Sequence, residues 1–130
     1  MAERRMFSKS LIHGSTFTDL PKAAQLLYFH MGLSCDDDGV CGNASVVCRM
    51  ARTSQQSLQT LIDTGWVLDL GDGVVAMTHW RVHNNIRSDR YKPTLHQTAF
   101  ARIRKNVDNV YIFAPTDTPT PVYQRDTQYR

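Results

Sequence analysis

The sequence predicts an α+β fold, on the basis of three observations. Apolar residues recur at helical spacing through the first half of the chain, up to Gly65. The spacing then changes to the alternation typical of strands, on both sides of a glycine-rich turn at residues 71–73. A length of 130 residues with 42% hydrophobic residues suffices for one core without disulfides or metals. We therefore expect one domain over residues 1–113 and a flexible Pro- and Thr-rich tail or linker over residues 114–130.

The first predicted elements are an extended segment and a long helix. Residues 6–13 place apolar side chains between polar ones, which favours a short strand or an arm. A helix is expected from a cap at Thr18 or Asp19 to about Ser34. Its apolar stripe consists of Leu20, Ala23, Ala24, Leu27 and Met31. This spacing requires one face of the helix to be buried.

A turn, a short strand and a second helix follow. Residues 36–39, Asp-Asp-Asp-Gly, favour a turn, and residues 40–41 are expected to form a very short strand. The second helix begins after Asn43 and covers about residues 44–51. We expect three of its side chains to face inward, namely Val46, Val47 and Met50.

The third predicted helix starts almost at once. Thr53 or Ser54 can cap its N-terminus, and Gly65 is placed to end it in the left-handed conformation. Its core positions are Leu58, Leu61 and Ile62. Because the connection is tight, the second and third helices are expected to form a helix-turn-helix pair.

A hairpin and a last helix complete the predicted fold. Residues 66–70 and 74–78 alternate in the manner of paired strands. Residues 79–93 are expected to be irregular or to contain one helical turn. Thr94 is a candidate cap for a C-terminal helix that carries Leu95, Ala99, Phe100 and Ile103. This order predicts a winged helix-turn-helix domain, with a three-helix core, a short β-hairpin wing, an N-terminal strand or arm and an extra C-terminal helix.

The cysteines and the hydropathy restrict the class of protein. Cys35, Cys41 and Cys48 are odd in number and lack the Cys-x-x-Cys spacing of a zinc site, so we expect them to be reduced and buried. No stretch approaches the ~20 apolar residues of a membrane span, and the N-terminal residues do not read as a secretory signal. We expect a soluble, cytoplasmic protein without membrane contact.

Positive charge is concentrated late in the predicted domain. Between His79 and Lys105 the chain has seven Lys and Arg residues against a single carboxylate, Asp89, although the formal net charge of the whole chain is only +3. The run at residues 36–38 is the expected negative pole, so we expect one positive face and one locally negative face. Such a distribution is typical of a protein that meets a polyanion, but also of an ordinary solvated surface.

Two groups of residues are candidates for contact with DNA. In a helix-turn-helix pair the second helix enters the major groove, where Gln, Ser and Thr side chains bind bases or phosphates. The first group belongs to the third helix and the arginines before it: Arg49, Arg52, Ser54, Gln55, Gln56, Gln59 and Thr60. The second group belongs to the basic segment after the hairpin: Arg81, Arg87, Arg90 and Lys92. We expect a duplex ligand, and the Arg, Asn and aromatic residues of the basic segment also suit single strands.

Less specific interpretations of both groups stay open. The third helix contains no Arg or Lys of its own and can be an ordinary Gln-rich exposed helix. In the basic segment the arginines can pair with carboxylates, and we expect Trp80 and Ile86 to be in the core and Arg87, Arg90 and Lys92 to be exposed. The predicted wing tip at residues 71–73 contains an acidic residue, so it is not expected to contact phosphates.

The sequence shows no apparatus for catalysis. Asp36, Asp37 and Asp38 can ligate a cation or simply form a turn, and consecutive carboxylates converge on one ion only in an unusual turn. His79 and His83 would share a face only within a helix, which leaves a zinc or nuclease site as a minor alternative. We find no phosphate-binding Gly-rich loop, nucleophile elbow or Cys-His arrangement. We therefore predict a protein that is not an enzyme and uses no cofactor or metal.

Several short segments within about residues 4–100 carry a family resemblance. They are Arg5-Met6-Phe7-Ser8, Leu26-Leu27-Tyr28-Phe29-His30-Met31, Asp36-Asp37-Asp38-Gly39, Gly73-Val74-Val75, His79-Trp80, Asn84-Asn85-Ile86-Arg87 and Asp89-Arg90-Tyr91-Lys92-Pro93-Thr94. Together they resemble the N-terminal domain of phage replisome organisers, a family related to the DnaD-type primosome proteins of Gram-positive bacteria. The resemblance implies a winged-helix domain that binds phage origin DNA and often self-associates, as a homodimer or a higher assembly.

The resemblance also implies a second domain that helps to recruit the host helicase loader in full-length members of the family. We expect this chain to be either a fragment that ends in its linker or a short relative without the loader-contacting part. The sequence thus predicts the DNA-binding domain of a phage or prophage replication initiator. Two alternatives stay open: a phage-encoded transcriptional regulator with the same fold, and a winged-helix module that binds a protein partner instead of DNA.

Overall fold

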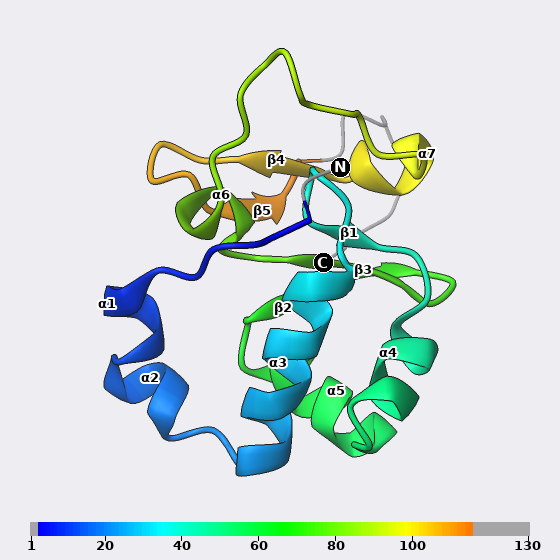
Figure 1. Ribbon diagram of the computed structural model, residues 1–130. Coiled ribbons are helices and arrows are strands. Elements are labelled where there is room, and N and C mark those ends of the chain that lie inside the picture. Colours follow the sequence, from blue (N-terminus) through cyan, green and yellow to red (C-terminus); the bar gives the residue numbers. More distant parts are fainter. Residues whose placement is uncertain (1–2, 116–130) are drawn as a thin grey trace.

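The structure is a computed structural model that describes residues 3–115. Helices and short antiparallel strands alternate along these residues, and the α+β class predicted from the sequence is confirmed. Figure 1 shows the long helices in the lower part of the view, a sheet across the middle and the C-terminal elements above it. Most of the predicted tail, residues 116–130, lies outside the described residues. None of the helices described has the length and apolar character needed to cross a membrane.

Three helices form the lower part of the molecule. They are α3 (Lys22–Ser34), α4 (Ala44–Met50) and α5 (Gln55–Asp63). α3 packs against both of the others. Leu27 and Met31 of α3 and Leu61 of α5 are completely buried, so the apolar stripes predicted from the sequence meet in one core. Gly65, with φ of +85°, ends the segment after α5 as predicted.

The central sheet has three antiparallel strands in the order β1-β3-β2. The strands are β1 (Val40–Cys41), β2 (Val67–Gly71) and β3 (Val74–Met77). Val40 lies opposite Ala76, which attaches the short first strand to the hairpin. The hairpin turns tightly because residues 71–73 all have φ between +54° and +94°. The predicted short strand and the predicted hairpin are both confirmed.

The N-terminal segment is helical where a strand or arm was predicted. Its two short helices are α1 (Lys9–Ile12) and α2 (Ser15–Thr18). The strand prediction is wrong for residues 9–12, because Leu11 and Ile12 pack onto the core from a helical turn. Phe17, only 1% exposed, holds α2 against the ring of Trp66. Asp19 ends α2, so the predicted cap of the long helix at Thr18 or Asp19 is wrong as well.

The C-terminal elements differ from the prediction in length and type. They are α6 (Trp80–His83), α7 (Gln97–Phe100), β4 (Ile103–Lys105) and β5 (Tyr111–Phe113). α6 is the predicted single helical turn, but the predicted last helix is reduced to α7. Ile103 pairs with Phe113 in a hairpin, which buries the Ile103 side chain and satisfies the strand backbone. Leu95, assigned to that helix from the sequence, is 94% exposed.

Most predicted core positions are confirmed, with exceptions in α3, where Ala23 is exposed, in α4 and after α6. Met50 is 59% exposed and Val46 is half-buried. The inward face of α4 is formed by Ala44, Val47 and Cys48 instead. Trp80 is completely buried as predicted, whereas Ile86 is only half-buried. All three cysteines are buried and free, as the sequence predicts.

Candidate nucleic-acid interface

The residues of the predicted helix-turn-helix contact group lie at the end of α4 and on α5. Ser54 caps α5, since its Oγ accepts a hydrogen bond from the backbone N–H of Ser57 at 3.4 Å. Most members of the group are exposed, and Thr60 is half-buried. The exposed members are Arg49, Arg52, Ser54, Gln55, Gln56 and Gln59. The first turns of α5 are therefore accessible, with both arginines just before its N-terminus.

Two glutamines of α5 already have side-chain hydrogen-bond partners. Gln55 donates to Ser45 Oγ at 3.2 Å, and Gln59 donates to Asp63 Oδ1 at 2.8 Å. All of these groups are at the surface, where water or a ligand can replace either partner at little cost. α5 thus offers uncharged donors and acceptors along its face and one carboxylate, Asp63, at its C-terminal end.

The basic segment after α6 keeps most of its charge at the surface. Arg87, Arg90 and Lys92 are all exposed, as predicted. Arg87 lies 3.2 Å from Asp89, but their side chains are 73% and 60% exposed, so this ion pair contributes little stability. The backbone N–H of Lys92 points the other way and donates to Asp37 Oδ2 at 3.0 Å. A backbone hydrogen bond thus holds the segment against the fold, while its basic side chains are exposed to solvent.

Arg81 has a partner inside the fold. Its guanidinium donates to Asp38 Oδ1 at 2.6 Å, and its Nε donates to the Tyr111 hydroxyl at 3.0 Å. Asp38 also accepts hydrogen bonds from the Tyr91 hydroxyl at 2.7 Å and from the backbone N–H of Thr94 at 2.8 Å. Burial raises the pKa of Tyr111 to about 12, which keeps its hydroxyl protonated. Arg81 therefore serves the fold, and we leave it out of the interface.

Two of the three carboxylates of the acidic run are buried and Asp36 is half-buried, which corrects the predicted negative face. Asp37 and Asp38 are both completely inaccessible to solvent. Asp37 Oδ1 lies 3.1 Å from the Arg5 guanidinium, and the Arg5 side chain is itself only 3% exposed. Arg5 also lies over the Trp80 ring, whose indole N–H donates to the Asp37 carbonyl at 2.9 Å. Buried carboxylates need such partners because desolvation is otherwise too costly.

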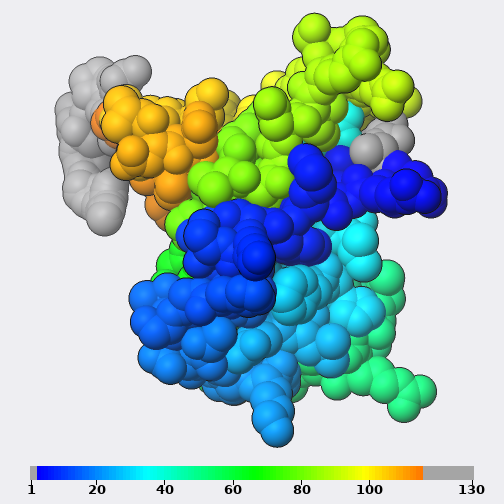
Figure 2. Space-filling view, turned by 60° about the vertical axis from the view of Figure 1, so that its left-hand side comes forward, coloured from blue at the N-terminus to red at the C-terminus, as the bar shows by residue number. Residues whose placement is uncertain are grey.

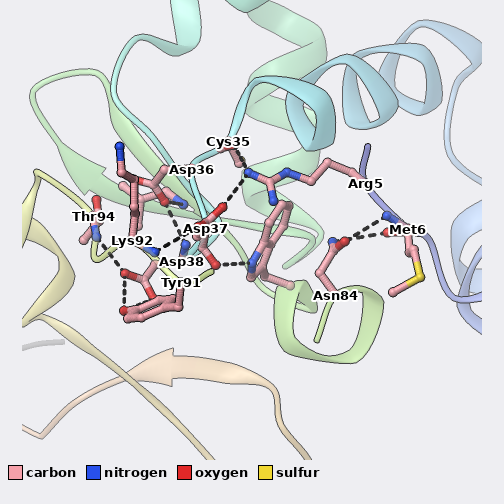
Figure 3. A network of polar contacts seen from close by, with 12 residues as sticks. Arg5, Met6, Cys35, Asp36, Asp37, Asp38, Asn84, Tyr91, Lys92 and Thr94 are labelled. Atoms are coloured by element: carbon pink, nitrogen blue, oxygen red, sulfur yellow. Dashed lines mark hydrogen bonds and ion pairs between the residues drawn. The ribbon is translucent and has the colours of Figure 1, made fainter. Parts of the chain in front are cut away.

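Two of the segments that carry the family resemblance, residues 36–39 and residues 89–94, contact one another. Residues 36–39 accept hydrogen bonds from the backbone N–H groups of Lys92 and Thr94 and from the Tyr91 hydroxyl, which contacts both carboxylate oxygens of Asp38, and Figure 3 shows this network. Asp36 Oδ1 accepts from the backbone N–H groups of Asp38 and Val40 at 3.0 Å each, which makes the run a turn. Across residues 3–115, no three His, Cys, Asp or Glu side chains are grouped so as to hold a metal ion.

His83, one of the two histidines considered as metal ligands, fastens the N-terminal segment to α6. Its Nδ1 accepts a hydrogen bond from the backbone N–H of Ser8 at 2.7 Å, so the neutral ring carries its proton on Nε2. That nitrogen lies 2.6 Å from the Tyr28 hydroxyl, to which it donates. Burial lowers the pKa of His83 to about 4, with His79 acting in the same direction. The ring is thus held neutral between two partners.

The two predicted contact groups are at opposite ends of the molecule. Figure 1 shows α4 and α5 at the lower end and the loop between α6 and α7 at the upper end, with the central sheet between them. The two groups therefore do not form one continuous ligand surface, and each end has to be considered separately.

Sequence reasoning did not select Arg104 and Lys105 as site residues. Both are exposed on β4, beside a hollow that also borders α6. Two short alternating stretches flank residues 106–109, Asn-Val-Asp-Asn, and this was the available signal for a hairpin. The hairpin was not predicted because residues 95–103 were assigned to a C-terminal helix.

Comparison of the chain with protein-family models, curated proteins and solved structures gave no match. The resemblance to phage replisome organisers therefore stays a prediction from short segments. The features that bear on function are the exposed polar residues of α5 and the positions of the exposed cations.

Proposed function

We propose that this chain is a winged-helix domain that binds duplex DNA through α5. The element order α3-β1-α4-α5-β2-β3, with strand order β1-β3-β2, supports this assignment. In a domain of this kind α4 and α5 are the helix-turn-helix pair, and the β2–β3 hairpin is the wing. The second helix of the pair is the one that enters the major groove.

The observation that carries the proposal is the composition of the exposed face of α5. Gln56 and Gln59 lie almost one turn apart on this face, opposite the buried Leu58 and Leu61. The amide of glutamine can bind adenine with two hydrogen bonds in the major groove. The helix has no carboxylate before Asp63, so its first two turns can approach phosphates without charge repulsion.

Arg49 and Arg52 supply the phosphate contacts in this proposal. Both are exposed: Arg49 is in the last turn of α4 and Arg52 is in the connection to α5, at whose N-terminus the helix dipole also favours an anion. The wing contributes less, because its tip carries Asp72 and the Gly73 carbonyl is engaged by the backbone N–H of Ala44 at 3.1 Å. Affinity should therefore depend on few phosphates and be weak without a preferred sequence.

We further propose origin DNA of a phage or prophage as the biological target, in keeping with the segment resemblance. A transcriptional regulator would use the same surface on a promoter. Selection of preferred sites from a randomised duplex library distinguishes the two, because the enriched sequence can be located at an origin or upstream of a gene.

The test measures fluorescence anisotropy of a labelled 20-base-pair random duplex across a salt series, with the full chain. Arg49→Gln with Arg52→Gln should weaken binding at least about tenfold at 0.1 M salt and reduce the log–log salt slope by about 1.8, since each neutralised phosphate contributes about 0.9. Arg90→Gln with Arg104→Gln is the matched control, because it removes the same charge from the other end of the molecule.

Binding of the control variant within about twofold of the wild type is the expected result. Equal losses in both variants would mean that net charge, and not α5, drives binding. Absence of duplex binding by the wild type even at low salt would sink the proposal and favour a module that binds a protein partner.

A further inference from the structure

The end of the molecule opposite α5 contains a hollow with cations on its rim. It has a volume of about 780 Å³ and lies between residues 3–6 and residues 84–90. Arg4, Arg87 and Arg90 border it and are exposed. Glu3 is the one carboxylate among the residues that line it. This surface plays no part in duplex binding by α5.

The walls of this hollow are fixed by hydrogen bonds. The Asn84 amide pairs with the backbone of Met6, accepting from its N–H at 2.8 Å and donating to its carbonyl at 3.2 Å. The buried Arg5 donates to the Cys35 carbonyl at 3.0 Å on the inner side of the same segment. Figure 3 shows these contacts beside the acidic turn. A preformed hollow binds a ligand without first having to order its walls.

A second hollow adjoins the first. It has a volume of about 480 Å³, lies between α6 and the β4–β5 hairpin, and is bordered by Arg104 and Lys105. Asn84 and Asn85 line both hollows, so the two lie on either side of this dipeptide. In the space-filling view of Figure 2, the green-yellow residues that follow β3 lie between the dark blue N-terminal segment and the orange hairpin. We call these two hollows the α6–α7 basic surface; its exposed polar residues are Glu3, Arg4, Asn85, Arg87, Arg90, Arg104, Lys105 and Asn109.

The cations of this surface are available to a ligand. Within residues 3–115, the ion pairs are Arg5–Asp37, Arg81–Asp38 and the weak, exposed Arg87–Asp89 pair, so Arg90, Arg104 and Lys105 have no carboxylate partner. Five exposed cations along two adjoining hollows form a positive concave surface, which raises the local concentration of a polyanion. The fold itself does not need these charges, because the buried acids are neutralised by other arginines.

The shape of the surface favours a flexible strand over a duplex. Proteins bind single strands in positively charged grooves, with bases stacked on aromatic rings or held by polar side chains. Here the amide of Asn85 is exposed between the hollows, and the ring of Phe100 lines the second of them. Hollows of this size accommodate individual nucleotides, whereas a duplex keeps its bases stacked inside and needs a projecting element to reach them.

We infer that the α6–α7 basic surface binds single-stranded DNA through its phosphates, at a site separate from α5. This inference goes beyond the duplex-binding proposal and does not depend on it. A molecule with both sites holds a duplex at one end and an unwound strand at the other, which is the geometry required where a duplex is opened.

The experiment uses the full chain and a fluorescein-labelled oligothymidylate of 20 nucleotides. Arg90→Gln with Arg104→Gln removes one cation from each hollow, and both side chains are exposed, so thermal unfolding should be unchanged. We expect the affinity for oligothymidylate to fall at least about tenfold at 0.1 M salt and the salt slope to decrease by about 1.4, because a single strand contributes about 0.7 per phosphate. Arg49→Gln with Arg52→Gln should leave this affinity within about twofold of the wild type.

The two proposals fail on different measurements. The inference is overturned if the Arg90 and Arg104 variant binds oligothymidylate like the wild type, or if the Arg49 and Arg52 variant loses as much. It is also overturned if the wild type does not bind oligothymidylate, and binding of polyglutamate in that case would assign the surface to an acidic protein segment. The duplex proposal is judged only by the duplex titrations.

Discussion

The two ends of the molecule use charge in different ways. At the α5 end, uncharged polar side chains cover an apolar core, and the exposed Arg49 and Arg52 provide the positive charge. At the α6–α7 end, two buried carboxylates organise the backbone of a loop whose cations project outward. The comparison shows that acidic residues inside the fold can be the reason that basic residues are displayed outside it.

This difference also suggests a division of binding properties. Glutamines on a helix suit the recognition of base edges, but they supply little long-range attraction. Arginines around a hollow supply attraction for any phosphate chain, with little sequence preference. We therefore expect sequence selectivity to reside at α5 and sequence-independent affinity at the α6–α7 basic surface.

The largest effect is expected from removal of a buried carboxylate. Asp37→Ala leaves the Arg5 guanidinium without its carboxylate partner at a site that is 3% exposed, and leaves the Lys92 N–H without its acceptor. We expect the free energy of unfolding to fall by about 3–5 kcal/mol, as for other broken buried ion pairs. Urea denaturation monitored by tryptophan fluorescence measures this change.

A matched substitution at the α5 end tests whether buried and exposed carboxylates contribute differently to stability. Asp63→Ala removes an exposed carboxylate from α5 and should change the free energy of unfolding by no more than about 0.5 kcal/mol. Replacing both members of the buried pair, with Arg5→Met and Asp37→Leu, should recover much of the loss, because no unpaired charge remains. Similar effects of Asp37→Ala and Asp63→Ala would contradict the proposed role of the buried acids.

The elements from α3 to β3 could be predicted because their patterns are local. Helical stripes, the cap at Ser54, Gly65 and the glycine-rich turn each depend on residues a few positions apart. The role of the acidic run could not be predicted in this way, because Asp38 meets its partners Tyr91 and Thr94 across more than fifty residues of sequence. A run of three carboxylates is usually found at the surface, and only the tertiary contacts reverse that expectation.

In the candidate site, too, local features could be predicted and long-range contacts could not. Exposure of Arg87, Arg90 and Lys92 could be predicted from composition, but the internal pairing of Arg81 could not. The separation of α5 from the basic segment depends on how the sheet is placed between them, and spacing along the chain carries no information about that. The β4–β5 hairpin was missed because Leu95, Ala99, Phe100 and Ile103 also fit helical spacing.

A smaller effect is expected from acid titration of His83, which ties the N-terminal segment to the α6–α7 end. Its pKa of about 4 in the folded chain is below the ordinary value of 6.5, so folding favours the neutral ring. The resulting stability is present above pH 6.5 and is lost as the pH falls towards 4. Between pH 7 and pH 5 we expect a loss of about 2 kcal/mol, measured by urea denaturation at each pH.

Two variants assign this pH dependence to His83. His83→Gln can keep an acceptor for the Ser8 N–H and a donor for the Tyr28 hydroxyl, but it does not titrate, so the pH dependence should be largely removed. His13→Gln, at an exposed position, should retain it. If His83→Gln remains as sensitive to pH as the wild type, other groups control acid stability.

The smallest effect is expected on duplex affinity when a single exposed carboxylate is removed from α5. Asp63→Asn removes the carboxylate on α5 and releases Gln59 from a charged hydrogen bond, while the helix itself should be slightly more stable without a negative charge at its C-terminal end. One exposed charge near phosphates is worth about 0.5 kcal/mol, so duplex affinity should increase about twofold at low salt.

Asp108→Asn, at the turn of the β4–β5 hairpin, is the matched control and should leave duplex affinity unchanged while increasing oligothymidylate affinity slightly. Both gains should disappear at about 0.5 M salt, because screening then acts over a few ångströms. An increase of both ligands' affinities in both variants would mean that the two ends act as one surface.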